Sequence, residues 1–315
     1  MNLQNPKRKA TRNGYGDGLL EIAEDKRIVA LTADLTGSTR VKDFANQYPD
    51  RFFQCGVAEQ NMVGVAAGLA LSGKKPFVST FGAFIPNRTL DQVRVSVCYQ
   101  NLDVKFGITH TGLTVGEDGA THQAMEDLAA MRSLPNMTVI VPCDYEETKK
   151  AVKVSAEHKG PVYLRLGRSK IPILTTEKDD FKIGKANILR EGKDVTIIAC
   201  GIMVYEALLA AEELSGKGID VEVINNHTIK PIDEKTLVKS AKKTGCIVTA
   251  EEHQKHAGLG SAVSEVIVKN NPVPMEFVAV DDTFGESGKP EELMKKYHLT
   301  SKDIVKSVLK VRKRK

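Results

Sequence analysis

Glu59 is an acidic residue at the start of an otherwise apolar segment. Residues 61–72 are apolar on nearly every side, with Gly64 and Gly68 one turn apart, which predicts a buried helix packed closely against a neighbouring element. A carboxylate in a first turn is often no more than a favourable partner of the helix dipole. Residues 52–55 are strand-like, so this helix is expected to begin inside the protein, where a carboxylate could hold and donate a proton.

Two histidines flank a glycine-rich loop that contains two acids. His110 ends the apolar run 104–109, and His122 follows a loop that includes Glu117 and Asp118. A lone histidine usually has a structural role, but this grouping at a strand end is typical of a site. Zinc is a poor alternative because no third ligand stands at an ordinary spacing. We therefore expect no metal site in this chain.

Other polar residues follow further predicted strands. Asp34 ends the apolar run 27–33, Ser38 lies just beyond it, and Arg168 follows the run 161–166. Open α/β sheets bind ligands beyond the carboxyl ends of their strands. Arg168 is thus a candidate anion clamp, although a surface ion pair is the commoner role of an arginine. Ser38 could equally cap a helix.

The order of apolar runs and periodic segments predicts an α/β fold with two doubly wound, mostly parallel domains. The first domain is expected at residues 1–175, with a polar linker at 176–190 and the second domain at 191–315. His253 and His256 fall in a loop predicted after the strand 246–251, where they could face a site or solvent. Phe81 and Phe84 are, by frequency, more often core residues than ligand contacts.

Composition excludes several classes of function. Lys and Arg number 45 against 40 Asp and Glu, and part of the excess lies at residues 7–9 and 310–315, so we expect solvated tails and no nucleic-acid surface. No apolar run reaches the length of a membrane span, and the N-terminus is unlike a signal peptide. Five scattered cysteines without metal or disulfide spacing fit a reducing cytoplasm.

Several motifs, in order, resemble the pyrimidine-binding domain of transketolases. They are Val57–Met62, Ser79–Phe84, Thr109–His110 with Gly116–Gln123, and Leu134–Met137 with Pro142–Asp144. The C-terminal part is similar to the last domain of the same enzymes, so the chain resembles the C-terminal half of a transketolase, the small subunit of a split enzyme. Nothing resembles the half that binds diphosphate and metal. Gly16-Asp17-Gly18 looks like that half's motif but lacks the hydrophobic strand that should precede it.

The resemblance implies a cofactor, thiamine diphosphate, and residues that hold it. Glu59 would hydrogen-bond a ring nitrogen of the aminopyrimidine and so promote removal of the thiazolium proton. Phe81 and Phe84 would pack on the pyrimidine ring, and Asp34 would lie near the thiazolium. Asn87 stands where a tyrosine is common in the family, which leaves the edge of the pyrimidine pocket open.

The resemblance also implies substrate contacts. His110 and Asp118 would contact the hydroxyl groups of a donor ketose, while Ser38, His122 and Arg168 would hold its phosphate. Glu59, His110 and His122 are the catalytic residues that follow from this assignment. Arg165 is a further cation to which the resemblance gives no role.

The implied reaction moves a two-carbon ketol unit from a ketose phosphate to an aldose phosphate. An N-terminal partner subunit would share the cofactor and hold Mg²⁺, in a heterotetramer with two copies of each subunit. Half of a deoxyxylulose-phosphate synthase, the β subunit of a 2-oxo-acid dehydrogenase and a non-enzymatic scaffold are the alternatives. The histidine pair around Asp118 favours transketolase over the other two enzymes, and the retained Glu59 argues against a scaffold. The donor and acceptor sugars stay open.

Overall fold

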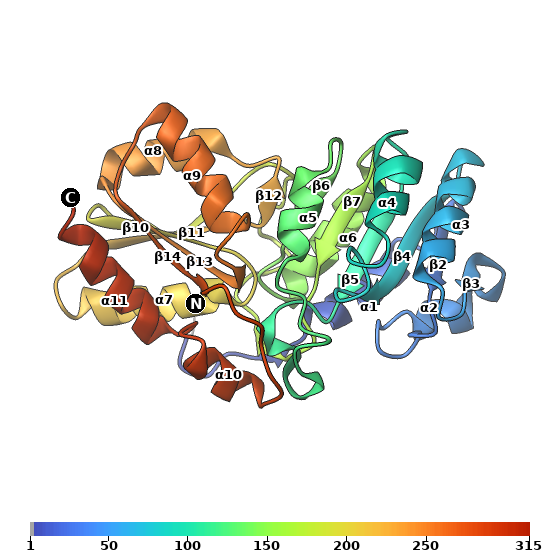
Figure 1. Cartoon of the computed structure of the whole chain (residues 1–315), viewed down its shortest axis with the longest axis horizontal. Helices are drawn as coiled ribbons and strands as arrows, with labels where there is room; N and C mark the ends of the chain where they lie inside the picture. The colour runs from blue at the N-terminus through green and yellow to red at the C-terminus, as the bar shows by residue number, and fades with distance from the viewer. Residues whose placement is uncertain (1–2) are drawn as a thin grey trace.

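Two α/β domains lie side by side along the long axis of the molecule (Figure 1). The computed structural model of the chain describes residues 3–315. Each domain has a central, mostly parallel sheet with helices on both faces. This arrangement confirms the predicted fold class. Within the described residues, no helix is both long and apolar enough to cross a bilayer.

The first domain contains a seven-stranded sheet in the order β12-β6-β7-β5-β4-β2-β3. All neighbouring strands are parallel except β12, which runs antiparallel to β6. The central strands are buried on both faces, as expected of continuous apolar runs. The strands are β2 (Ile28–Thr32), β3 (Phe52–Gln54), β4 (Lys75–Phe81), β5 (Lys105–Thr109), β6 (Thr138–Ile140), β7 (Val162–Arg165) and β12 (Thr228–Lys230).

Two helical layers cover this sheet. One core joins α1, α2 and α6 to the first face, and another joins α3, η2 and α5 to the second face. The helices are α1 (Thr11–Glu21), α2 (Lys42–Gln47), η1 (Pro49–Arg51), α3 (Glu59–Leu71), α4 (Leu90–Gln92), η2 (Val93–Cys98), η3 (Leu113–Asp118), α5 (Asp127–Ser133) and α6 (Tyr145–Glu157). Gly16-Asp17-Gly18 lies inside α1 and follows no hydrophobic strand, so it has the wrong setting for a diphosphate motif.

The predicted burial of α3 against a neighbouring element holds for one face of the helix and not for the face that carries its glycines. Met62, Val63 and Ala66 face the core, but Gly64 and Gly68 are exposed. A Cβ atom built on either glycine meets no other atom within 4 Å. The small residues therefore lie on a free face of the helix, which is available to another chain.

The second domain contains a five-stranded sheet in the order β14-β13-β10-β11-β9. Helices α8 and α9 cover one face, and α7 and α11 cover the other (Figure 1). Its strands are β9 (Asn187–Arg190), β10 (Val195–Ala199), β11 (Val221–Asn225), β13 (Ile247–Gln254) and β14 (Met275–Val280). Its helices are α7 (Met203–Ser215), α8 (Glu234–Thr244), α9 (Leu259–Asn270), α10 (Pro290–Lys296) and α11 (Ser301–Arg312). The last four residues of the expected linker thus form β9 in this sheet.

The basic ends of the chain are ordered on the folded surface, and most of their cationic side chains are exposed to solvent, as expected. Strand β1 (Arg8–Lys9) pairs with β8 (Ile171–Pro172), and Lys9 Nζ donates to Asp17 at 2.8 Å. At the other end, Lys310 and Arg314 both form ion pairs with Glu276. Strand pairing holds the N-terminal segment on the folded surface, and ion pairs hold the C-terminal segment there.

Buried polar contacts join the two domains. Arg165 is 4% exposed and its Nε lies 2.9 Å from Asp127, while its Nη2 donates to the backbone carbonyl of Glu252 in β13. The Glu252 carboxylate in turn accepts from the backbone N–H and the hydroxyl of Thr114 at 3.0 and 2.9 Å. Arg165 therefore has a structural role, as a tie between the domains.

The predicted loop after residue 251 is wrong for His253. Strand β13 continues to Gln254, so His253 lies within the sheet and is fully buried. Burial lowers its pKa to about 4. His256 does lie in the following loop and is exposed. The strand extends because Glu251, Glu252 and His253, all polar, are buried against neighbouring elements, which an apolar pattern does not reveal.

Candidate active site

Most of the expected site residues gather beyond the carboxyl ends of four parallel strands. Asp34 and Ser38 follow β2, Phe81 and Phe84 lie at the end of β4 and just after it, His110 follows β5 and Arg168 follows β7. Parallel strands end at the same edge of a sheet, so this edge collects side chains from distant parts of the sequence. The loop through η3 adds Asp118 and His122.

Four aromatic rings form the centre of the group. The Phe81 ring stacks on the His110 ring with centroids 3.7 Å apart, and on the Phe84 ring at 5.7 Å. His122 meets Phe84 edge-on at 5.7 Å. Phe81 thus connects the Phe84 side of the site with the His110 side.

Glu59 lies at one end of this aromatic group. It is the first residue of α3 and is 5% exposed. Its Oε1 accepts from Nη1 of Arg88 at 3.0 Å, and the guanidinium carbon of Arg88 lies 4.0 Å from the centre of the Phe84 ring. A flat group with N–H donors therefore covers Phe84 and is bonded to the buried carboxylate. These are the two contacts that a planar, N–H-bearing heterocycle needs.

His110 occupies the other end and is neutral. It is 3% exposed, and burial, followed by the charges of Arg12 and Arg168, lowers its pKa to about 3. Its Nε2 lies 3.3 Å from Nη1 of Arg12, and its Nδ1 lies 2.9 Å from the hydroxyl of Thr109. An arginine only donates, so Nε2 accepts here and Nδ1–H donates to Thr109.

Arginines surround His110. Arg12 donates to the carbonyl of Ser38 at 3.1 Å, and Arg168 donates to the carbonyl of Val115 at 2.6 Å and to Glu117 at 2.9 Å. Burial, followed by the charges of Arg40 and Arg168, lowers the pKa of Arg12 to about 10. Mutually repelling guanidinium groups around one histidine form a site that an anion would stabilise.

The two acids expected in the site lie at its rim. Asp34 is exposed, and its backbone N–H donates to Gln54 at 2.7 Å. Asp118 is also exposed, and its charge acts on Arg12. Neither makes a direct contact with the aromatic group among the interactions of residues 3–315. No group of three or more His, Cys, Asp or Glu side chains in that range is arranged to hold a metal ion.

Backbone strain supports the choice of this edge. Asp34, Arg40 and His110 have φ values of 60°, 67° and 55°, in the left-handed region that residues other than glycine rarely adopt. Such residues concentrate at functional sites because the surrounding structure must hold them in place.

Three arginines of the site were missed by sequence reasoning. Arg12 opens α1, Arg40 precedes α2, and Arg88 follows the Phe84 turn. Each is a single cation in a polar stretch, with no motif or periodicity around it. Arg12 also lies close to the basic segment 7–9, which resembled a solvated tail. Only tertiary structure brings these residues to the strand ends.

Comparison with known proteins agrees with this architecture. Residues 7–173 match the transketolase pyrimidine-binding domain, and residues 184–304 match the transketolase C-terminal domain. The chain is 50% identical over 305 residues to a 6-deoxy-6-sulfo-D-fructose transketolase subunit of a Clostridium species, covering 96% of this chain and 95% of that protein. It is 42% identical over 303 residues to one of the subunits of apulose-4-phosphate transketolase from Phocaeicola vulgatus, covering 95% and 96%.

A solved structure is similar over nearly its whole length. It is described as a split-gene transketolase in an inactive beta4 tetramer, with a TM-score of 0.90 and 48% identity, covering 97% of this chain and 99% of that one. The chain therefore belongs to the transketolase family, in which it corresponds to the C-terminal half: a pyrimidine-binding domain followed by the transketolase C-terminal domain.

Proposed function

We propose that the chain is the C-terminal subunit of a split, thiamine-diphosphate-dependent transketolase that transfers a two-carbon ketol unit from a ketose phosphate to an aldose phosphate. The observation that carries this proposal is the buried Glu59 carboxylate beside the face of Phe84. Relatives that match over nearly their full length are themselves transketolase subunits, which supports a split enzyme.

The residues fit the aminopyrimidine of the cofactor. Arg88 supplies a planar donor over Phe84 that is bonded to Glu59, and an aminopyrimidine protonated at its ring nitrogen has a similar planar shape and one ring N–H donor. Thiamine diphosphate, when bound, supplies the carbon nucleophile of ketol transfer. Glu59 would hold a proton at the pyrimidine ring nitrogen, and Phe84 with Phe81 would fix the plane of the ring. Arg88 has to leave this position before the ring can enter.

The contacts favour a division of substrate roles different from the one that the resemblance implied. His110 lies beside Arg12 and within reach of the Arg168 charge, whereas His122 packs edge-on against Phe84. We therefore assign His110, Arg12, Ser38 and Arg168 to the terminal phosphate of the sugar. His122 and Asp118 then serve the hydroxyl groups near the reacting carbon.

A neutral His110 is suited to this role. The hydroxyl of Thr109 donates to the carbonyl of Thr80 at 3.5 Å, and if it turned to donate to Nδ1 instead, the ring proton would move to Nε2. An Nε2–H group then faces the anion beside Arg12. A neutral donor adds a hydrogen bond without adding to the repulsion among the arginines.

The diphosphate and Mg²⁺ are assigned to an N-terminal partner subunit, in a heterotetramer with two copies of each chain. Exposed apolar residues just before α3, at its end and just after η2 support a subunit contact. Val57 is 73% exposed, Leu71 66% and Tyr99 86%, beside the exposed Gly64 and Gly68. Grouped apolar residues of this kind mark interaction surfaces. The similar beta4 tetramer is described as inactive, in line with a chain that needs another subunit for activity.

Reconstitution tests the proposal. The chain alone should bind thiamine diphosphate weakly and show no ketol transfer, because the charged end of the cofactor lacks its ligands. Mixing with the partner subunit should produce Mg²⁺-dependent binding, measured by calorimetry, and activity with hydroxypyruvate or a ketose phosphate. Tight Mg²⁺-dependent binding by the isolated chain, or an active monomer, would contradict the split-enzyme proposal.

A further inference from the structure

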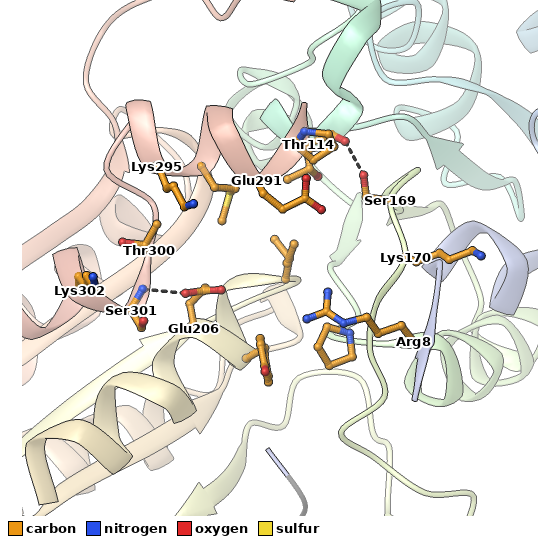
Figure 2. Close-up of a pocket in the computed structure, with 15 residues that line it drawn as sticks. Arg8, Thr114, Ser169, Lys170, Glu206, Glu291, Lys295, Thr300, Ser301 and Lys302 are labelled. Carbon is orange, nitrogen blue, oxygen red and sulfur yellow. Dashed lines mark hydrogen bonds between the residues drawn. The ribbon is translucent and has the colours of Figure 1, made fainter. Parts of the chain in front are cut away.

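A cavity of about 460 Å³ lies between the two domains, next to α10 (Figure 2). Its volume is in the range of small-molecule sites. None of the residues assigned above to cofactor or substrate lines it. The lining residues are Arg8, Thr114, Ser169, Lys170, Pro172, Ile202, Tyr205, Glu206, Pro290, Glu291, Met294, Lys295, Thr300, Ser301 and Lys302.

Three of the cations that line this cavity have no carboxylate partner in the described part of the chain. Arg8, Lys295 and Lys302 form no ion pair with any carboxylate in residues 3–315. Figure 2 shows the Arg8 guanidinium extending into the space, whereas Lys170 turns away from it. One of the two lining carboxylates, that of Glu206, already accepts from the backbone N–H of Ser301 at 2.7 Å. Arg8, Lys295 and Lys302 outnumber the two lining carboxylates, Glu206 and Glu291, so the cavity lining is net positive.

The same cavity has an apolar wall. Ile202, Met294 and Pro172 contribute it together with the ring of Tyr205. The Tyr205 hydroxyl donates to the carbonyl of Leu3 at 2.9 Å, so the ring presents its apolar part to the cavity. Arg8 lies over this ring, 5.8 Å from its centre. An apolar wall beside free cations matches a ligand that combines a ring with an anionic group.

One wall is also the back of the loop that holds Arg168. The Ser169 hydroxyl donates to the carbonyl of Thr114 at 2.7 Å. Arg168 precedes Ser169 and Val115 follows Thr114. These two neighbours are joined by a second hydrogen bond, which the Arg168 guanidinium donates to the carbonyl of Val115 at 2.6 Å. A ligand that displaces Ser169 or Thr114 therefore changes the position of the arginine on the other side of the loop.

We propose that this interdomain cavity binds a small phosphate or sulfonate that carries a ring, and that its occupancy adjusts Arg168 through the Ser169–Thr114 contact. The binding step stands independently, and the coupling step rests on the proposed function of Arg168. The site would make the enzyme responsive to a metabolite other than its substrates. Arg8 and Lys295 bind the anion, and Tyr205 packs against the ring.

Titration with adenosine monophosphate tests binding, with adenosine and inorganic phosphate as partial ligands. We expect calorimetry on the full chain to show binding of the nucleotide that is at least about tenfold tighter than that of either part. Arg8→Gln and Lys295→Gln should each weaken it about fivefold. Lys296→Gln is the matched control, because Lys296 is on the same helix but pairs with Glu286 at 2.5 Å.

An Arg12→Ala variant separates this cavity from the substrate site. Nucleotide binding that survives Arg12→Ala and fails with Arg8→Gln supports the proposal. Binding that is lost with Arg12→Ala, unaffected by the Arg8 and Lys295 changes, or equal for all three probes overturns it. The readout is affinity, so it does not depend on the chain being a transketolase.

Kinetics of the reconstituted enzyme test the coupling. The nucleotide should change KM for a phosphorylated donor but not for hydroxypyruvate, which has no phosphate for Arg168 to hold. Ser169→Ala should keep nucleotide binding and abolish the KM change, because it removes the contact with Thr114. If the nucleotide binds and KM for the phosphorylated donor stays constant, the coupling step is wrong.

Discussion

Arg88 covers Glu59: its guanidinium donates to the buried carboxylate at 3.0 Å, and the guanidinium carbon lies 4.0 Å from the centre of the Phe84 ring. The arginine is half exposed, so the ion pair stabilises the cofactor-free protein only modestly, by about 1 kcal/mol or less. On the proposed function, an entering aminopyrimidine would have to replace both contacts. The cofactor-free chain thus keeps its carboxylate paired until the ring arrives.

Replacement of Arg88 by alanine should therefore have opposite effects on two measurements. Thermal stability of the cofactor-free chain should fall slightly, because Glu59 loses its partner. Cofactor affinity of the reconstituted enzyme should rise up to about fivefold, because nothing has to be displaced. Arg94→Ala, at an exposed position on η2, is the matched control. Weaker cofactor binding in Arg88→Ala would instead mean that Arg88 contacts the bound cofactor.

Glu59→Gln tests the proton that this carboxylate is proposed to hold. Glutamine keeps the size and a hydrogen-bond acceptor but does not titrate, so cofactor binding should persist. Turnover should fall by about 10²- to 10⁴-fold, the usual contribution of a general acid or base. Deuterium exchange at the thiazolium carbon of the bound cofactor should slow in parallel. An unchanged exchange rate would leave Glu59 as a first-turn acid of α3 without a chemical role.

Replacement of His110 and of His122 should affect different kinds of donor substrate. His110→Ala and Arg12→Ala should raise KM for phosphorylated donors by about tenfold to a hundredfold, the effect of a lost charge-assisted hydrogen bond, with little change for hydroxypyruvate. His122→Ala should lower kcat for both donors, because it lies beside the Phe84 ring. Matched steady-state kinetics provide the measurement. The reverse result would restore the roles that the family resemblance implied.

Arg165 should matter for stability. Arg165→Met leaves Asp127 buried without its cation, and breaking a buried pair in this way costs about 3–5 kcal/mol. Urea unfolding measures the loss. Arg27→Met removes a well-bonded but exposed pair with Asp25 and should have little effect. Comparable losses in the two variants would show that the contact between the domains adds nothing to the ion pair.

His227 should make stability depend on pH. It is fully buried and stacked on Phe181 at 4.2 Å, and burial lowers its pKa from 6.5 to about 4. Between these values the unfolded chain binds a proton that the folded chain does not, so this residue destabilises the fold as pH falls. Relative to His227→Gln, the native protein should lose up to about 1.4 kcal/mol per pH unit over that window. Urea unfolding at neutral and mildly acidic pH checks the slope, and parallel curves would contradict it.

The sequence predicts the strands and helices of this protein better than the tertiary contacts that their residues make. Apolar runs locate β2, β5 and β7 because central parallel strands are buried on both faces. Glu59 and His122 can be located because each lies within a short motif of consecutive residues. Arg12 has no local signal, because it contacts Ser38 and His110, both more than twenty residues away. The bond from Arg88 to Glu59 is equally distant in sequence. The free face of α3 is also hidden, because a helix buried by its own chain and one buried by another chain share the same apolar pattern.

Strand β12 has a consequence for how this chain can be divided. It comes from the second half of the sequence, yet it completes the edge of the first sheet by pairing with β6. A truncation in the polar segment before residue 187 would leave β6 as an unprotected edge, ready to pair with other chains. Exchange of the C-terminal domain between relatives would carry one strand of the pyrimidine-binding sheet with it. A junction beyond Lys230 would keep β12 with the first sheet, but it would separate β10 from its neighbour β13 in the second sheet. Neither a junction in the linker nor one beyond Lys230 therefore leaves both sheets with their native strands.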